Sequence, residues 1–262
     1  MARSPSIRPG DPRVAPDLKP LQPKWGARHA AAPAGSQDDN QGLASGRLRE
    51  RMVARLRQQG IADDAVLRAM GQVPRHRFVD EGLASRVYED TALPIGHQQT
   101  LSQPYVVARS LSLARSHCRA DGDRSRALEI GTGCGYQAAV MAGLFSSVVS
   151  IERIEGLHRD ARRNLAALAL SNLHLILGDG LDGCPEMAPF DAMVLAAGLA
   201  DTPLELLRQL QVGGVMVGPL GWPDQRLVVV RRCQDDGNAE PTFERFEFDA
   251  VQFVPILKGI QR

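Results

Sequence analysis

Short apolar runs that are typical of β-strands alternate with helical segments after residue 126, and this alternation restricts the fold more than any other feature. Alternating strands and helices form a mostly parallel sheet that helices cover on both faces, joined by right-handed crossovers. The sequence therefore predicts a doubly wound α/β fold. The strand-like runs are 127–130, 148–151, 173–177, 192–195, 215–217 and 227–230, and the expected helices between them are 136–144, 157–170 and 203–210.

Residues 1–45 differ from the rest of the chain in composition. They hold seven of the 17 prolines and show no helical or strand period. A segment with so little apolar surface to bury cannot offset its ordering entropy, so we expect a disordered Pro-rich extension. Residues 46–262 form the expected domain, with helices and a substrate loop over 46–125 and a cofactor-binding sheet with C-terminal strands over 126–262. Asp63 is expected to cap a helix.

The balance of charge and the spacing of the cysteines exclude several classes of protein. The 31 basic residues oppose 30 acidic ones, whereas non-specific nucleic-acid binding needs a clustered basic face. The four cysteines show neither a C-x-x-C pair nor zinc-ligand spacing, so we expect no metal and a reducing compartment. Prolines and charges interrupt the N-terminus where an export signal needs an apolar run. We therefore expect a cytoplasmic protein with no nucleic-acid or membrane partner; the sequence does not determine the oligomeric state, and a monomer is the default expectation.

The strongest local motif is the run Leu-Glu-Ile-Gly-Thr-Gly-Cys-Gly-Tyr at 128–136, an apolar strand that enters a glycine turn and then a helix. Glycines allow backbone to approach a ligand closely. The spacing is G-x-G-x-G rather than the dinucleotide pattern G-x-G-x-x-G. Glu129, just before Gly131 and Gly133, would repel a pyrophosphate but suits a ligand that carries an ammonium group. A tight turn without any ligand is the alternative interpretation.

Two further features follow the next two strand-like runs. Glu152 lies about 20 residues past the glycines, where a carboxylate can accept both hydroxyls of a ribose. Asp179 and Gly180 follow the third strand-like run. Each could be a surface residue or a simple turn, but in a parallel sheet they converge at one edge. Together the three features predict an adenosine-bearing cofactor.

At this point the chain resembles the protein-L-isoaspartate O-methyltransferases over about residues 47–258. The resemblance rests on the motifs Leu-Pro-Ile-Gly at 93–96, Gln-Thr-Leu-Ser-Gln-Pro at 99–104, the glycine turn, Gly-Asp-Gly at 178–180, Ala-Pro-Phe-Asp at 188–191 and Phe-Val-Pro at 253–255. The loop at 99–104 is the most discriminating motif, because methyltransferases in general share only the glycine turn.

The resemblance implies a seven-stranded Rossmann-like methyltransferase sheet with an N-terminal helical and loop addition, and S-adenosylmethionine as cofactor. It implies that Ser102 is the active-site residue and that Thr100 lies beside it. Glu129, Gly131 and Gly133 would contact the methionine end of the cofactor, Glu152 its ribose, and Asp179 with Gly180 its adenine end. The implied partners are proteins and peptides that contain L-isoaspartyl residues, whose methylation initiates repair through a succinimide.

The residues also allow other interpretations. Ser102 could simply cap the helix that follows it. Cys134 and Gly198 depart from the family pattern, so the pocket wall near Gly198 is open to question. Two alternative functions remain. The protein could be a methyltransferase that acts on another carboxylate or small molecule, or a non-catalytic adaptor that holds the cofactor. For the expected reaction no general base is needed, because an α-carboxyl with a pKa of about 3.3–3.7 is ionised at neutral pH.

Overall fold

Five parallel strands form one side of the sheet, out to its edge, in the computed structural model, which describes residues 7–10, 38–118, 125–234 and 241–262. The strand order is β1-β10-β9-β8-β7-β4-β5-β6, with β9 antiparallel to β8 and β10 antiparallel to β9. The strands are β1 (Ile7–Pro9), β4 (Arg126–Ile130), β5 (Ser147–Glu152), β6 (Leu173–Leu177), β7 (Phe190–Leu195), β8 (Leu210–Leu220), β9 (Arg226–Arg232) and β10 (Phe243–Ala250).

Each of the six strand-like runs lies inside one of these strands, which confirms the α/β class and the mostly parallel sheet. The expected helices are present but shorter than the patterns suggested. The helices are α1 (Asp38–Gln58), α2 (Asp64–Gln72), α3 (Pro104–His117), α4 (Tyr136–Ala142), α5 (Glu155–Ala166) and α6 (Leu204–Leu207), and a small hairpin of β2 (Leu93–Pro94) and β3 (Thr100–Leu101) precedes α3.

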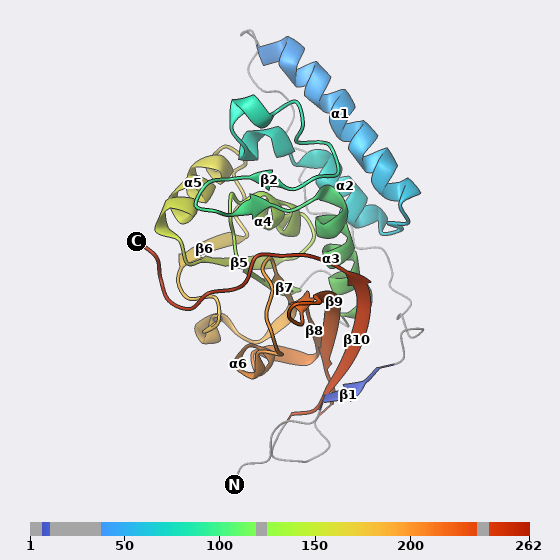
Figure 1. The fold of residues 1–262 in the computed structure, drawn as a ribbon, viewed down its shortest axis with the longest axis vertical. Helices are drawn as coiled ribbons and strands as arrows, with labels where there is room; N and C mark the ends of the chain where they lie inside the picture. The colour runs from blue at the N-terminus through green and yellow to red at the C-terminus, as the bar shows by residue number, and fades with distance from the viewer. Residues whose placement is uncertain (1–6, 11–37, 119–124, 235–240) are drawn as a thin grey trace.

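The buried strands face two cores because side chains alternate along a strand. Ala192 and Val194 of β7 pack in the core that α1–α5 cover, whereas Met193 and Leu195 pack in the core with α6. Figure 1 shows α1–α5 above the sheet and α6 below it. The sheet is therefore covered on both faces, as a doubly wound fold requires.

The N-terminal part of the chain differs from the expectation in two places. The sheet has eight strands rather than seven, because β1 pairs with β10 in parallel and Gly10 N–H donates to the Arg245 carbonyl at 2.8 Å. In addition, α1 begins at Asp38, inside the segment 1–45 that was expected to be disordered. Once the turns near Met52 and Leu56 are packed, each further helical residue adds a hydrogen bond at little cost. The rest of that segment lies outside the described residues.

Local signals are accurate at the start of α2. The Asp63 side chain accepts hydrogen bonds from Ala65 N–H at 2.9 Å and from Val66 N–H at 3.2 Å, which confirms it as the N-cap.

Residues 130–151 carry no charged side chain, and they contain the end of β4, the helix α4 and most of β5. Within the described ranges, no helix combines the length and the apolar character that crossing a membrane requires.

Candidate functional site

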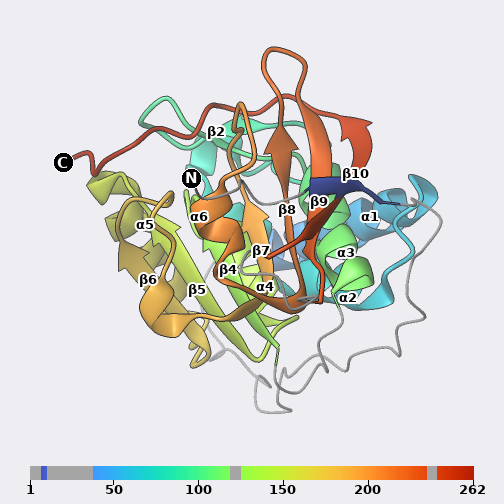
Figure 2. The same cartoon turned by 90° about the horizontal axis from the view of Figure 1, so that it is seen from below.

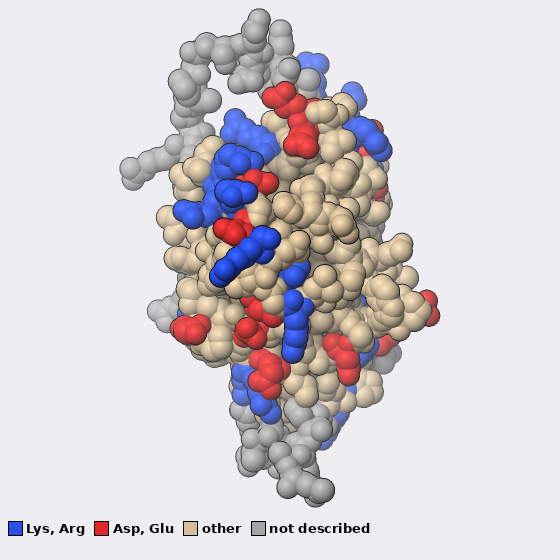
Figure 3. Space-filling model, turned by 60° about the vertical axis from the view of Figure 1, so that its left-hand side comes forward, with Lys and Arg blue, Asp and Glu red and all other residues tan. Residues whose placement is uncertain are grey.

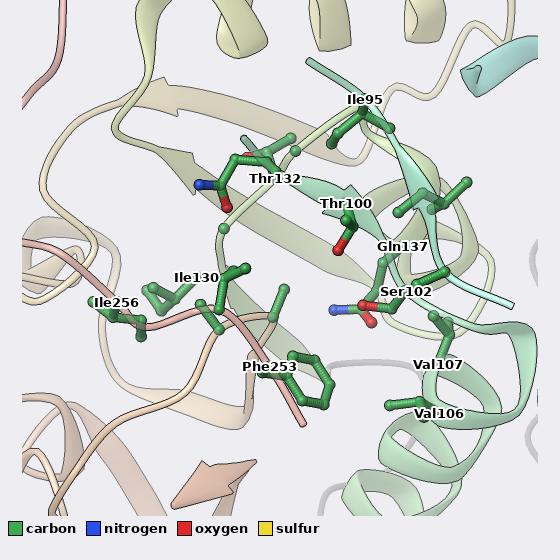
Figure 4. Close-up of a pocket in the computed structure, with 18 of the residues that line it drawn as sticks. Ile95, Thr100, Ser102, Val106, Val107, Ile130, Thr132, Gln137, Phe253 and Ile256 are labelled. Atoms are coloured by element: carbon green, nitrogen blue, oxygen red, sulfur yellow. The ribbon is translucent and has the colours of Figure 1, made fainter. Parts of the chain in front are cut away.

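A cavity of about 780 Å³ lies where the parallel strands β4, β5 and β7 end. This is the edge at which sheets of this kind bind ligands. Three segments that are distant in the sequence enclose the cavity: the glycine turn after β4, the stretch from Ala92 to Arg109, and the C-terminal stretch from Asp249 to Leu257. Figure 4 shows side chains from all three pointing into one space, and Figure 2 shows the C-terminal stretch crossing the strand ends.

The glycine turn presents its backbone to the cavity. The N–H groups of Gly131 and Thr132 donate to the Ile151 carbonyl at 2.9 and 3.2 Å, which ties the turn to the end of β5. Gly133 has a φ of 55°, and a Cβ there would lie 3.1 Å from Ile95 Cδ1. Glycine accommodates both the left-handed backbone and the close approach of the β2–β3 hairpin, whereas a residue with a Cβ would be strained and would crowd Ile95.

Glu152 lies at the cavity wall and supports the glycine turn. Its Oε2 accepts a hydrogen bond from Gly133 N–H at 2.8 Å, and its Oε1 accepts one from Ile154 N–H at 2.9 Å. An ionised carboxylate has about four lone-pair sites. Two sites therefore remain on the Glu152 carboxylate for donors on a ligand.

Thr100 and Ser102 lie across the cavity from the glycine turn. Thr100 belongs to β3, Ser102 follows it, and Figure 4 shows both side chains pointing into the cavity. The helix α3 is capped by Gln103, without a side-chain hydrogen bond, so Ser102 is not its N-cap. The Ser102 carbonyl accepts a hydrogen bond from Arg75 Nη2 at 2.5 Å. The interpretation of Ser102 as a helix cap is therefore wrong, and its hydroxyl is available to a ligand.

Gly180 lines the cavity, whereas its neighbour Asp179 does not. The Asp179 carboxylate accepts hydrogen bonds from Leu181 N–H at 2.9 Å and from Gly259 N–H at 2.6 Å. Asp179 therefore holds Gly259, two residues beyond the C-terminal stretch, near the end of β6. A Cβ on Gly180 would lie 2.4 Å from Ile130 Cγ2, so this wall has no room for a side chain.

Glu129 is fully buried behind the glycine turn and is not among the residues that line the cavity. Its Oε2 accepts a hydrogen bond from Ser150 Oγ at 2.5 Å, and the Ser150 hydroxyl also bonds to that of Thr132, a cavity residue, at 2.6 Å. Burial raises the pKa of Glu129 to about 8, and the hydrogen bond from Ser150 opposes this shift. The Ser150 hydroxyl thus links the Glu129 carboxyl group to the cavity residue Thr132.

The C-terminal stretch is the part of the site that local patterns did not locate. Gly198 N–H donates to the Val254 carbonyl, and Ile256 N–H donates to the Gly198 carbonyl, both at 2.8 Å. The Gln225 amide accepts from Phe253 N–H at 2.7 Å and donates to the Phe253 carbonyl at 3.1 Å. A Cβ on Gly198 would lie 2.6 Å from Gln225 Nε2. The absence of a side chain on Gly198 thus allows Gln225 and the C-terminal stretch to close this wall.

The charged and nucleophilic groups of the cavity are few. Arg109 of α3 forms an ion pair of 2.8 Å with Asp249, and both line the cavity. Burial raises the pKa of Cys134 to about 11, so its sulfur is a neutral thiol at physiological pH. In the described part of the chain, no group of three or more His, Cys, Asp or Glu residues could hold a metal ion. The cavity can bind and orient a ligand through hydroxyls, backbone groups and two carboxylates.

Comparisons with known proteins agree with this geometry. The family model "Protein-L-isoaspartate(D-aspartate) O-methyltransferase (PCMT)" matches residues 47–261. A protein-L-isoaspartate O-methyltransferase of Bordetella petrii is 50% identical over 259 residues, which cover 98% of this chain and 92% of the relative. One of Bordetella avium is 56% identical over 223 residues, covering 85% and 81%.

A solved structure shows the same fold at lower identity. It is a putative protein-L-isoaspartate O-methyltransferase of Plasmodium falciparum in complex with S-adenosyl-L-homocysteine, 25% identical, with a TM-score of 0.66 and coverage of 80% of this chain and 98% of that one. Because the family model spans most of the chain and the two relatives are 50% and 56% identical to it in sequence, the chain belongs to the protein-L-isoaspartate(D-aspartate) O-methyltransferase family.

Proposed function

We propose that this protein transfers a methyl group from S-adenosylmethionine to the free α-carboxyl group of L-isoaspartyl residues in damaged proteins and peptides. One observation carries the proposal: the Thr100 and Ser102 hydroxyls face the glycine turn across a single cavity. The loop at 99–104, which is the most discriminating motif of the family, and the glycine turn, which methyltransferases in general share, therefore line the same cavity. The relatives' printed names and the bound S-adenosyl-L-homocysteine of the Plasmodium structure support the same reaction and cofactor.

The cavity fits an adenosine-bearing amino acid cofactor. Gly131, Gly133 and Gly180 leave backbone bare on one wall, and Glu152 keeps lone pairs for the ribose hydroxyls. We propose that these residues and Thr100 contact the cofactor. We propose indirect roles for Glu129 and Asp179. The Glu129 carboxyl group is buried and bonds to Ser150, whose hydroxyl bonds to the cavity residue Thr132, and Asp179 accepts a hydrogen bond from Gly259.

The chain's own residues supply orientation and exclusion of water. When bound, S-adenosylmethionine supplies an electrophilic methyl group. The Ser102 hydroxyl donates a hydrogen bond to the substrate carboxylate and fixes the direction of the attacking oxygen, so positioning supplies most of the rate enhancement. Side chains such as Ile95, Val107 and Phe253 line the cavity and exclude water from the reacting atoms. No residue needs to remove a proton, because the α-carboxyl is already ionised at neutral pH.

We also propose the setting in which the protein works. A monomer stays our prediction for the oligomeric state. None of the four cysteines, which all lie in the described ranges, forms a disulfide, and this supports the reducing environment of the cytoplasm. The face in Figure 3 carries both acidic and basic side chains, and the net charge is only +1, which favours a peptide substrate over a nucleic acid.

The decisive experiment measures methyl transfer from labelled S-adenosylmethionine to a short peptide with one L-isoaspartyl residue. The same peptide with normal aspartate is the matched control. We expect labelling of the isoaspartyl peptide alone. Absence of labelling in both peptides, with cofactor binding intact, would instead favour a small-molecule methyltransferase or an adaptor.

A further inference from the structure

Arg75 is a fully buried arginine that lies one layer behind the cavity. It begins a short 3₁₀ helix, Arg75–Phe78, and none of its surface is exposed. Its Nε donates to the Val87 carbonyl at 2.8 Å and its Nη2 donates to the Ser102 carbonyl at 2.5 Å. Its guanidinium carbon lies 4.5 Å from the centre of the Tyr136 ring. One side chain therefore contacts three segments of the chain, two of which line the cavity through Ser102 and Tyr136.

Arg75 is buried without a carboxylate beside it in the described part of the chain. The ion pairs there involve other residues, and burial lowers the pKa of Arg75 while the neighbouring Tyr136 and Cys134 oppose that shift. A buried cation with no counter-charge is costly unless carbonyls and a π face surround it. If Arg75 served packing alone, an apolar side chain of similar volume would stabilise the fold at least as well, because it carries no charge to desolvate.

Two of the contacts of Arg75, those with Ser102 and Tyr136, connect the two halves of the active site. Ser102 carries the hydroxyl that we assign to the substrate carboxylate, and Tyr136 is the first residue of α4, directly after the glycine turn. The Tyr136 ring is held in turn by an edge-on contact with Phe78, at 5.6 Å between ring centres. The guanidinium therefore sets the distance between the substrate loop and the segment that we assign to the cofactor.

We propose that Arg75 is a positioning residue for methyl transfer, which holds the Ser102 loop in register with the glycine turn. The inference rests on the proposed function, since it concerns how Ser102 is aimed at the substrate. A planar guanidinium donates to two carbonyls while its face packs on a ring. A lysine ammonium keeps the charge but has no planar array of N–H donors. After Arg75→Lys the side chain therefore cannot bind both carbonyls and pack on the ring at once.

The test is Arg75→Lys, compared with Arg77→Lys in the same short helix, where the side chain is exposed. Wild type is assayed first, so that failure of the proposed function appears as no isoaspartyl methylation in any variant. We expect Arg75→Lys to lower kcat about 10- to 100-fold, because small misplacements of reacting groups have effects of that size. The dissociation constant for S-adenosylhomocysteine should change little, and Arg77→Lys should behave as wild type.

A double-mutant cycle with Ser102→Ala separates positioning from a general loss of stability. If Arg75 acts through Ser102, Arg75→Lys should lower kcat much less in the Ser102→Ala background than in wild type. Equal fold losses in both backgrounds, or an unchanged kcat for Arg75→Lys, would overturn the proposal. If Arg75→Lys does not fold, Tyr136→Leu removes the ring beneath the guanidinium while sparing both hydrogen bonds, and the same cycle is measured with it; equal losses there would also overturn it.

Discussion

The carboxylate of Glu152, at the end of β5, accepts a hydrogen bond from the N–H of Gly133, in the glycine turn after β4, at 2.8 Å. The same carboxylate binds Ile154 N–H at 2.9 Å. These contacts join two neighbouring strand ends into one rigid wall of the cavity. The residue that we assign to the cofactor ribose is thus also the residue that shapes the turn beside it.

Replacing Glu152 should therefore weaken cofactor binding in two ways. Glu152→Ala removes the acceptor for the ribose hydroxyls and releases Gly133. Hydrogen bonds to charged groups contribute about 1.5–3 kcal/mol each, so we expect the dissociation constant for S-adenosylhomocysteine to rise at least about tenfold by calorimetry. Glu155→Ala, at an exposed position of α5, is the control. An unaltered affinity in Glu152→Ala would mean that the cofactor binds elsewhere.

Ser102→Ala separates binding of the cofactor from transfer of its methyl group. The hydroxyl points into the cavity, and the Ser102 carbonyl that Arg75 binds is retained in the variant. We expect an unchanged affinity for S-adenosylhomocysteine and a kcat about 10- to 100-fold lower with an isoaspartyl peptide, because the carboxylate loses its positioning donor. Ser116→Ala, which removes a hydroxyl bonded to the Leu113 carbonyl in α3, should leave kcat unchanged. Full turnover in Ser102→Ala would remove the role assigned to Ser102.

Stability without ligand should depend on pH through Glu129. Burial raises its pKa from 4.5 to about 8, so the folded state binds the proton more tightly than the unfolded state does. This contribution to stability is complete below pH 4.5 and is lost as the pH rises to about 8. We expect Glu129→Gln, which stays neutral, to gain stability relative to wild type over that range, by on the order of a few kcal/mol.

The measurement for Glu129 is urea unfolding of the ligand-free protein at several pH values between 5 and 9. The exposed residue Glu81 offers a matched control, because Glu81→Gln removes a carboxylate without burial. If the stability difference between Glu129→Gln and wild type were the same at every pH, the carboxyl group would titrate normally in the folded protein.

Gly198→Ala should disturb the C-terminal wall. The added Cβ would lie 2.6 Å from Gln225 Nε2, the group that binds the Phe253 carbonyl. We expect overpacking to reduce the free energy of unfolding by about 1–3 kcal/mol and to raise the KM for the peptide. Gly82→Ala, where a Cβ meets nothing within 4 Å, is the control for both measurements. Wild-type stability and KM in Gly198→Ala would show that this wall can shift freely.

Much of the fold could be predicted because its signals are local. The apolar runs identified six strands, the carboxylate of Asp63 identified a helix start, and the glycines at 131, 133 and 135 identified the turn that faces the cavity. Backbone sterics, capping and the two-residue period of a strand act over a few residues, so a single segment reveals them. The convergence of strand ends predicted that Glu152 and Gly180 lie near one another, and both line the cavity; Thr100 and Ser102, which also line it, were assigned through the family resemblance.

Pairings between distant segments decided the rest. Glu129 lies near the end of one expected strand and Asp179 follows another, yet Glu129 is buried behind the turn and Asp179 binds Gly259. The strand β1 depends on β10, and the wall over residues 249–257 depends on hydrogen bonds to Gly198 and Gln225. Such pairings gain their free energy only after the chain has closed a long loop. The sequence by itself determined the strands, the turn and the chemistry available, whereas the tertiary structure alone decided which polar groups face the cavity and which are used to close it.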